Sequence, residues 1–276
     1  MKVLLLASGS TQSIQSAQHL RSRLIAAGID AYMQNLQEKK ELSVPVEELA
    51  LMVPMGGDGT FLAAAHLIDF APVPLLGLNY GHLAFLSGSP ERDEVELICD
   101  ALCGDVVFER RATLDARITC EDGSSCTHTA LNELAFTRGM SGHMVQYKYS
   151  VNGTLIANVQ ADGIITSTAT GSTAYALSAG GPIISPGYKG LLVVPVAPHT
   201  ILSRALVLSS SDVLELELLG EYIHEASLFL DGQVLNLEST PSHITCQRGE
   251  KEVLFACGGG DFFQNVASTF FQGNKE

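Results

Sequence analysis

Apolar residues in the first hundred positions form short continuous runs with helical stretches between them. The runs Val3–Ala7, Leu51–Met55 and Val73–Leu78 are too short for helices, so they predict buried strands. After the first run, Ala17, Leu20, Leu24 and Ile25 recur at spacings of three and four, which predicts a helix with one apolar stripe. Gly28 then marks the end of that helix.

A second helix is predicted from Phe61 to Ile68, directly after a glycine-rich turn that follows the second apolar run. Strand, helix and strand in this order are typical of a parallel sheet with helices on its faces. The N-terminal part is therefore expected to be an α/β domain. We place this domain at residues 1–105.

Beyond residue 105 the helical periodicity gives way to alternation. Val213–Leu218 alternates apolar and acidic residues, which predicts a strand with one buried face. Asn152-Gly153 and Asp231-Gly232 each separate two apolar segments and predict type I′ hairpin turns. The paired segments are 144–151 with 154–159, and 228–230 with 234–237. We expect a β-rich, sandwich-like domain over residues 106–257, and a helical tail over 258–276 that packs back on the first domain.

Composition and charge narrow the classes of partner. The chain has 276 residues, 46% of them hydrophobic, which is ample for a buried core. Its net charge of −14 disfavours nucleic acid and anionic membrane surfaces, because both bind through Lys and Arg. No apolar run approaches the roughly 18 residues that a membrane span needs. The six cysteines form no C-x-x-C pair, so we expect free thiols and a cytoplasmic protein.

The turn Gly56-Gly57-Asp58-Gly59-Thr60 carries the first chemical signal. It lies where a buried strand ends and a helix begins, the position at which parallel sheets bind ligands. Glycines let backbone N–H groups approach phosphates, and the helix N-terminus adds positive potential, so Gly56, Gly57, Gly59 and Thr60 are candidate contacts to donor phosphates. Asp58 repels phosphate, which indicates metal binding or proton abstraction; helix capping is the structural alternative.

Two polar segments in the β-rich part carry the second signal. Asn132-Glu133 follows apolar residues and can bind ribose hydroxyls or an amide, although on its own the pair favours the simpler interpretation of a strand-end turn. Residues 162–178 contain a short apolar strand and then a run of small and hydroxylated residues ending with Tyr175, on which a ligand ring can stack. A Ser/Thr-rich linker is the alternative, which the flanking strand and Pro182 disfavour.

These motifs resemble the NAD kinase family. The resemblance rests on GGDGT at 56–60, NE at 132–133, DGIITSTATGSTAYALSAGGP at 162–182 and DGQ at 231–233, in the family's order and spacing. It implies phosphorylation of the 2′-hydroxyl of the adenosine ribose of NAD, with ATP or polyphosphate as donor, a divalent cation (Mg²⁺) and a homodimer or homotetramer. The metal ligands are left open. His82, Ala84, Ala169 and Ala205 depart from the usual family residues.

The resemblance also implies roles for individual residues. Asp58 is expected to be the catalytic base and, with Gly59, to line the NAD site. Asn132 and Glu133 are expected to contact the nucleotide, and Asp162 to meet the nicotinamide ribose across a subunit boundary. The segment Thr173, Ala174, Tyr175, Ala176, Leu177 and Ser178 is expected to surround the adenosine. His143, Gln160 and Gln233 are further expected contacts.

Two other functions remain open at this point. A lipid or sugar kinase can share the GGDGT turn, although the acidic charge and the hydroxyl-rich segment disfavour a lipid substrate. A non-catalytic dinucleotide sensor is the alternative of a different class. Asp58 disfavours it, because a carboxylate near phosphate weakens simple binding.

Overall fold

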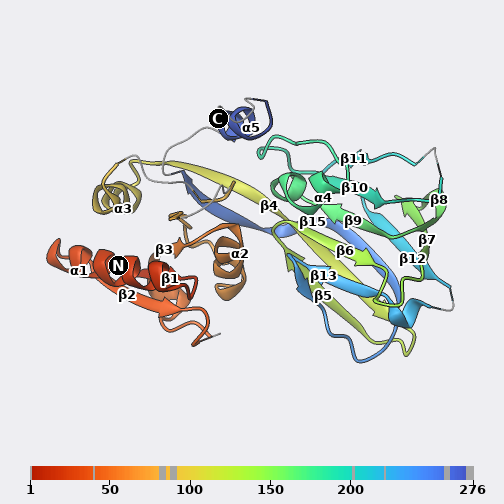
Figure 1. The fold of residues 1–276 in the computed structure, drawn as a ribbon, viewed down its shortest axis with the longest axis horizontal. Coiled ribbons are helices and arrows are strands. Elements are labelled where there is room, and N and C mark those ends of the chain that lie inside the picture. Colours follow the sequence, from red (N-terminus) through yellow and green to blue (C-terminus); the bar gives the residue numbers. More distant parts are fainter. Residues whose placement is uncertain are drawn as a thin grey trace. The chain divides into compact units, whose positions relative to one another are not determined.

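A computed structural model describes residues 2–39, 41–80, 85–87, 92–200, 203–220, 222–257 and 262–271. The chain forms two compact units, one of residues 1–110 with 252–276 and the other of residues 111–251. Figure 1 labels their elements. Within the described residues, no helix is long and apolar enough to cross a membrane.

The first unit contains a parallel sheet of three strands in the order β2-β1-β3. Its elements are β1 (Lys2–Ala7), α1 (Thr11–Ala26), β2 (Asp30–Asn35), the 3-10 turn η1 (Val46–Glu48), β3 (Leu49–Met55), α2 (Asp58–Leu67), α3 (Glu94–Cys103), α5 (Phe262–Val266) and the π-helical η4 (Ala267–Phe271). Parallel strands joined through helices confirm the expected α/β class of this unit.

The first helix forms as its pattern predicts, with one exception. Ser10 caps α1 by accepting the N–H of Ser13, and Ala17, Leu20 and Leu24 pack against the apolar residues of β1. Ile25 is 49% exposed, so its assignment to the buried stripe was wrong. Leu24 and Ile25 are neighbours, so they lie about 100° apart around a helix with 3.6 residues per turn, and Leu24 takes the buried position.

Three local expectations for this unit change. The helix α2 begins at Asp58, three residues before the predicted start, so the aspartate lies in its first turn. Residues 73–78 run parallel to β3 through bridges at Leu75 and Leu78 but form no continuous strand, because Pro54 of β3 has no N–H to donate between the two bridges. The strand β2 and the helix α3 were not predicted; α3 is capped by Asp93 and buries Leu97 and Ile98.

The second unit contains two antiparallel sheets of six strands. Their orders are β11-β10-β9-β6-β13-β14 and β5-β4-β15-β12-β7-β8. The strands are β4 (Val107–Cys120), β5 (Ser125–Ala130), β6 (Glu133–Thr137), β7 (Val145–Val151), β8 (Thr154–Ala161), β9 (Gly163–Ser167), β10 (Leu191–Val196), β11 (Leu206–Leu208), β12 (Leu214–Leu219), β13 (Ser227–Leu230), β14 (Gln233–Val234) and β15 (Pro241–Cys257). Short helical turns are η2 (Thr170–Thr173), α4 (Tyr175–Ser178) and η3 (Ile223–Glu225).

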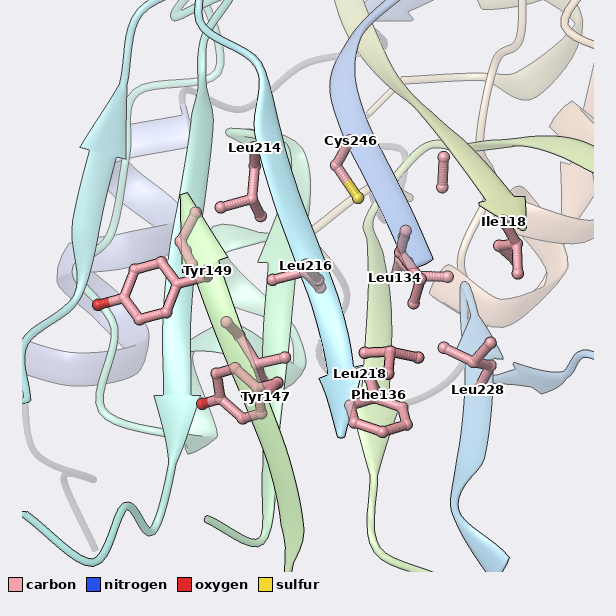
Figure 2. Packing of buried hydrophobic residues seen from close by; sticks show 14 of the residues in the cluster. Ile118, Leu134, Phe136, Tyr147, Tyr149, Leu214, Leu216, Leu218, Leu228 and Cys246 are labelled. Atoms are coloured by element: carbon pink, nitrogen blue, oxygen red, sulfur yellow. The ribbon is translucent and has the colours of Figure 1, made fainter. Parts of the chain in front are cut away.

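The two sheets pack face to face, which confirms the expected sandwich. One buried cluster takes alternate residues from both sheets, and Figure 2 shows the side chains of β7 and β12 meeting those of β6 and β13. The labelled residues are Ile118, Leu134, Phe136, Tyr147, Tyr149, Leu214, Leu216, Leu218, Leu228 and Cys246. The alternation of β12 is as predicted, with Leu214, Leu216 and Leu218 buried and the two glutamates between them more exposed.

Both predicted hairpin turns form. Asn152 and Gly153 have φ of 50° and 75°, and Asp231 and Gly232 have φ of 47° and 77°. Positive φ at both central residues is the type I′ geometry, which suits the twist of the flanking strands. The strand after Asp231-Gly232 is shorter than expected, because β14 ends at Val234. This second turn becomes important for the candidate site.

Candidate active site

The glycine turn at residues 56–60 joins β3 to α2, as expected. Gly57 is the N-cap, and Asp58 is the first residue of the helix. A Cβ on Gly56 would lie 2.4 Å from Thr60 Oγ1, so close packing requires a glycine there, whereas a Cβ on Gly57 or Gly59 would meet nothing within 4 Å. Gly56 and Thr60 already donate their backbone N–H groups, to Leu78 and Gly57 carbonyls. Gly57 and Gly59 are therefore the better placed of the four predicted phosphate contacts.

A second turn of the same kind was missed by the sequence analysis. The residues Ser8-Gly9-Ser10 follow β1, and Ser10 caps the N-terminus of α1. Since β1 and β3 are adjacent and parallel, both turns and both helix N-termini lie at one edge of the sheet. The two turns are linked, because Ser13 Oγ donates to the Met55 carbonyl over 2.6 Å and accepts the N–H of Ser8. A small polar turn after the first strand was the available signal.

The carboxylate of Asp58 does not cap its own helix. It accepts the backbone N–H of Phe85 at Oδ2 over 3.0 Å and that of Leu86 at Oδ1 over 2.8 Å. Burial raises the pKa of this carboxyl, and the N–H donors of Phe85, Leu86 and Ser87 act in the opposite direction. Asp58 is thus a half-desolvated carboxylate whose direction is set by a loop some 27 residues away.

That loop is itself held by the C-terminal tail. The rings of Phe85 and Phe270 stack with centroids 5.9 Å apart and planes 10° from parallel. A Cβ on Gly77 would lie 2.8 Å from the Leu86 carbonyl, so the loop also packs closely on the segment beside β3. The tail is helical from Phe262 to Phe271, as its spacing predicts. His82, Ala84 and residues 258–261 lie outside the described part of the chain.

Asn132 and Glu133 lie at the junction between β6 and β9 in the second unit. Both are buried, and the Asn132 carbonyl accepts the N–H of Thr168 over 2.8 Å and the hydroxyl of Ser167 over 3.1 Å. Asn132 Oδ1 and Glu133 Oε2 are buried without a hydrogen-bond partner among the described residues. Unpaired buried polar atoms are unusual and call for a ligand, a proton or water.

The hydroxyl-rich segment after β9 is ordered, and the linker interpretation was wrong. Several of its hydroxyls bond inside the protein: Thr168 donates to the Leu131 carbonyl over 2.6 Å, and Ser172 to the Ala169 carbonyl over 2.7 Å. Ala176 belongs to the segment that was expected to surround the adenosine, but it is fully buried and contributes to packing inside the protein. Thr173, Ala174, Tyr175, Leu177 and Ser178 keep exposed area, and Tyr175 is 42% exposed.

The remaining predicted residues lie elsewhere in the second unit. Asp162 Oδ1 is 3.2 Å from Arg138 Nη1, at the opposite end of the β6/β9 pair from Glu133. Asp162 is five residue steps from Ser167, the partner of Glu133, which is about 17 Å along an extended strand, so Asp162 and Glu133 of one chain cannot hold the same ribose. His143 stacks on Tyr222 with ring centroids 3.8 Å apart. Gln160 lies next to the last residue of β8, and Gln233 is the first residue of β14. Both are exposed.

The structure therefore groups the predicted residues into separate clusters. Asp58 and the glycines belong to the first unit; Asn132, Glu133 and residues 173–178 share one end of the β6/β9 pair in the second unit; Asp162 marks the other end. In the described ranges, no group of three or more His, Cys, Asp or Glu side chains could hold a metal ion.

Comparison with known proteins identifies the family. The description "ATP-NAD kinase N-terminal domain" matches residues 3–105, and "ATP-NAD kinase C-terminal domain" matches residues 131–257. The chain belongs to the NAD kinase family. It is 35% identical over 241 residues to the NAD kinase of Leifsonia xyli, covering 82% of this chain and 79% of that one. It is 38% identical over 207 residues to the NAD kinase of Cupriavidus pinatubonensis, covering 75% and 67%.

Solved structures agree on the fold. Yeast NADH kinase, crystallised with NADH, superposes with a TM-score of 0.87 at 22% identity, covering all of this chain and 89% of that one. The NAD kinase of Archaeoglobus fulgidus, crystallised with ATP, gives a TM-score of 0.76 at 23% identity, covering 97% and 99%. The predicted family, fold class and kinase activity are confirmed, and the lipid-kinase, sugar-kinase and sensor alternatives lose their support.

Proposed function

We propose that this protein transfers the terminal phosphoryl group of ATP to the 2′-hydroxyl of the adenosine ribose of NAD, with Asp58 as the general base. The observation that carries the proposal is the setting of Asp58 in a chain of this family. Its carboxylate lies in the first turn of a helix that follows a glycine turn, and two backbone N–H groups fix its direction. Each carboxylate oxygen still has a lone pair to accept a proton.

The reaction follows from this placement. The ribose oxygen bonds to the terminal phosphorus as the bond to the ADP oxygen breaks, and the hydroxyl proton passes to Asp58. Desolvation raises the pKa of Asp58, which makes the ionised form a stronger base than an exposed aspartate. Gly57, Gly59 and the N-terminus of α2 supply N–H groups and positive potential for donor phosphates.

A divalent cation, Mg²⁺, is proposed to enter with the donor. Mg²⁺ is commonly bound by one or two carboxylates together with substrate phosphates rather than by a protein cage. Asp58 fits one such carboxylate, because it is the acidic side chain at the glycine turn where donor phosphates are proposed to bind. Bound there, the cation would neutralise charge that develops on the phosphoryl oxygens.

The nucleotide contacts are proposed on the second unit. Asn132 Oδ1 and Glu133 Oε2 are unpaired and suited to ribose or adenine atoms, and Tyr175 offers an exposed ring nearby in the fold. Asp162 lies at the far end of the β6/β9 pair. We therefore propose that it binds the nicotinamide ribose in a site that a second copy of the chain completes. A homodimer or homotetramer and a cytoplasmic location remain predictions from the sequence.

The test is NADP formation by purified protein from NAD, ATP and Mg²⁺, repeated with inorganic polyphosphate in place of ATP. We expect NADP with at least one donor and none without Mg²⁺. Analytical ultracentrifugation of the same protein measures whether the chain self-associates. Transfer to a lipid or sugar alcohol but not to NAD would disprove the proposal.

A further inference from the structure

Asp231 occupies an unusual position in the second hairpin turn. Its side chain is only 7% exposed, and its φ is positive. The sequence alone explains it as a type I′ turn residue, a role that asparagine fills equally well. Its hydrogen bonds show that it does more than form the turn.

The carboxylate of Asp231 binds three consecutive backbone N–H groups about a hundred residues earlier in the chain. Oδ2 accepts the N–H of Leu131 over 2.8 Å, and Oδ1 accepts those of Asn132 over 2.7 Å and Glu133 over 3.1 Å. The N–H of Asp231 donates to the Glu133 carbonyl over 3.0 Å. An asparagine has one acceptor oxygen and an NH₂ group, so it cannot reproduce this pattern.

These bonds place the two residues that hold unpaired polar atoms. Asn132 and Glu133 are each 6% exposed, and their Oδ1 and Oε2 atoms have no partner among the described residues. Leaving such atoms unpaired is costly, because their hydration is lost on burial and nothing replaces it. A ligand atom that bonds to them recovers that energy, so their orientation affects ligand affinity.

The carboxyl of Glu133 also lies in the field of Asp231. Burial and the charge of Asp231 together raise the pKa of Glu133 to about 8, with the N–H of Tyr175 acting in the opposite direction. Among the described residues, Asp231 from the β13–β14 turn and the Tyr175 N–H from α4 act on Glu133, and Ser167 is its strand partner on β9. Of these, Asp231 is the charged one. Burial and the charge of Asp231 therefore both favour the acid form of Glu133, which has an O–H to donate.

We propose that Asp231 is a positioning residue of the NAD site, which orients Asn132 and Glu133 through their backbone N–H groups. Glu133 then donates to an acceptor atom of the nucleotide, such as a ribose oxygen or a purine ring nitrogen, while Asn132 Oδ1 accepts from a hydroxyl or amino group. The inference rests on the proposed function for the identity of the ligand.

The test is NAD affinity measured by calorimetry from pH 6 to pH 9 at constant ionic strength. For the wild type we expect constant affinity up to about pH 7 and weakening of up to about tenfold per pH unit above about pH 8, as Glu133 loses its proton. Glu133→Gln cannot ionise, so its profile should be flat. Asp231→Asn keeps the turn but loses acceptors, and should weaken NAD binding about 5- to 150-fold at pH 7 with the fall beginning at lower pH.

The matched control is Asp212→Asn. Asp212 also accepts a backbone N–H, that of Ser209 over 2.7 Å, and a side-chain amide, that of Asn152, but it is exposed on another turn. Its variant should bind NAD as the wild type does at every pH. The inference is overturned if Glu133→Gln keeps the wild-type pH profile, or if Asp231→Asn and Asp212→Asn bind alike. The profile of Glu133→Gln decides the question even if Asp231→Asn fails to fold. Failure of the proposed function is distinct: the wild type would then form no NADP at any pH.

Discussion

Replacing Asp58 by asparagine separates its chemical role from its structural one. The substitution keeps the shape of the side chain and removes the charge that accepts a proton. General-base catalysis typically contributes about 10²- to 10⁴-fold, so we expect turnover to fall by that factor, equivalent to about 2.7–5.4 kcal/mol. NAD should still bind, because the other proposed nucleotide contacts, Asn132, Glu133 and Tyr175, belong to the second unit.

The structural cost of the same substitution is smaller. The carboxylate accepts two backbone N–H groups, from Phe85 and Leu86, and the asparagine oxygen can keep one of them. Losing one buried bond costs about 1–3 kcal/mol, and removal of a carboxylate whose pKa burial already raises offsets part of that cost. A net loss near 1 kcal/mol lowers the Tm by about 2–4 °C in a chain of this size. The variant therefore stays folded at 25 °C.

The assay measures initial rates of NADP formation together with NAD affinity and thermal unfolding. Asp93→Asn is the matched control, because Asp93 also accepts two backbone N–H groups, at the N-cap of α3 in the same unit. It should show a similar small change in Tm and normal turnover. If Asp58→Asn kept more than a tenth of wild-type turnover, Asp58 would be an anchor of the loop at residues 85–87 and not the base.

Three further predictions follow from contacts around the site. Phe270→Ala removes the ring that stacks on Phe85, so we expect kcat to fall about 2- to 13-fold with KM for NAD unchanged. The control is Phe271→Ala, which should leave both constants unchanged because Phe271 is 77% exposed. Equal effects of the two substitutions would contradict the role of the tail. Gly171→Ala places a Cβ 2.4 Å from the Asn132 carbonyl oxygen, so unfolding experiments should show about 1–3 kcal/mol of lost stability, while Gly187→Ala, where a Cβ meets nothing within 4 Å, should be near neutral. Because the pKa of Glu133 is raised from 4.5 to about 8, the folded state binds more protons than the unfolded state between those values, and stability falls as pH rises through this window; denaturant titrations should show that Glu133→Gln lacks this slope, and parallel profiles would refute the assignment.

The sequence by itself determined the features that depend on short stretches of chain. Apolar runs and a 3.6-residue period specified β1, α1 and β3, and strict alternation specified β12, because each pattern has one conformation that buries its apolar side. Asn152-Gly153 and Asp231-Gly232 specified two hairpins, because few residues tolerate positive φ at both central positions. The GGDGT and NE motifs likewise indicated candidate site residues, because the residue types within each short motif suffice to suggest phosphate or nucleotide binding.

Only the tertiary structure decided which distant groups meet. Nothing near Asp58 in the sequence indicates that its carboxylate binds the loop at Phe85 and Leu86, or that Phe270 packs on that loop. The sequence predicts a turn residue at Asp231 but not its three hydrogen bonds to the N–H groups of residues 131–133. It also predicts a buried Ile25, whereas Leu24 occupies the buried position. The physical reason is that hydrogen bonds and burial between segments up to a hundred or more residues apart depend on how sheets and loops pack. Local propensity and periodicity carry no information about that packing.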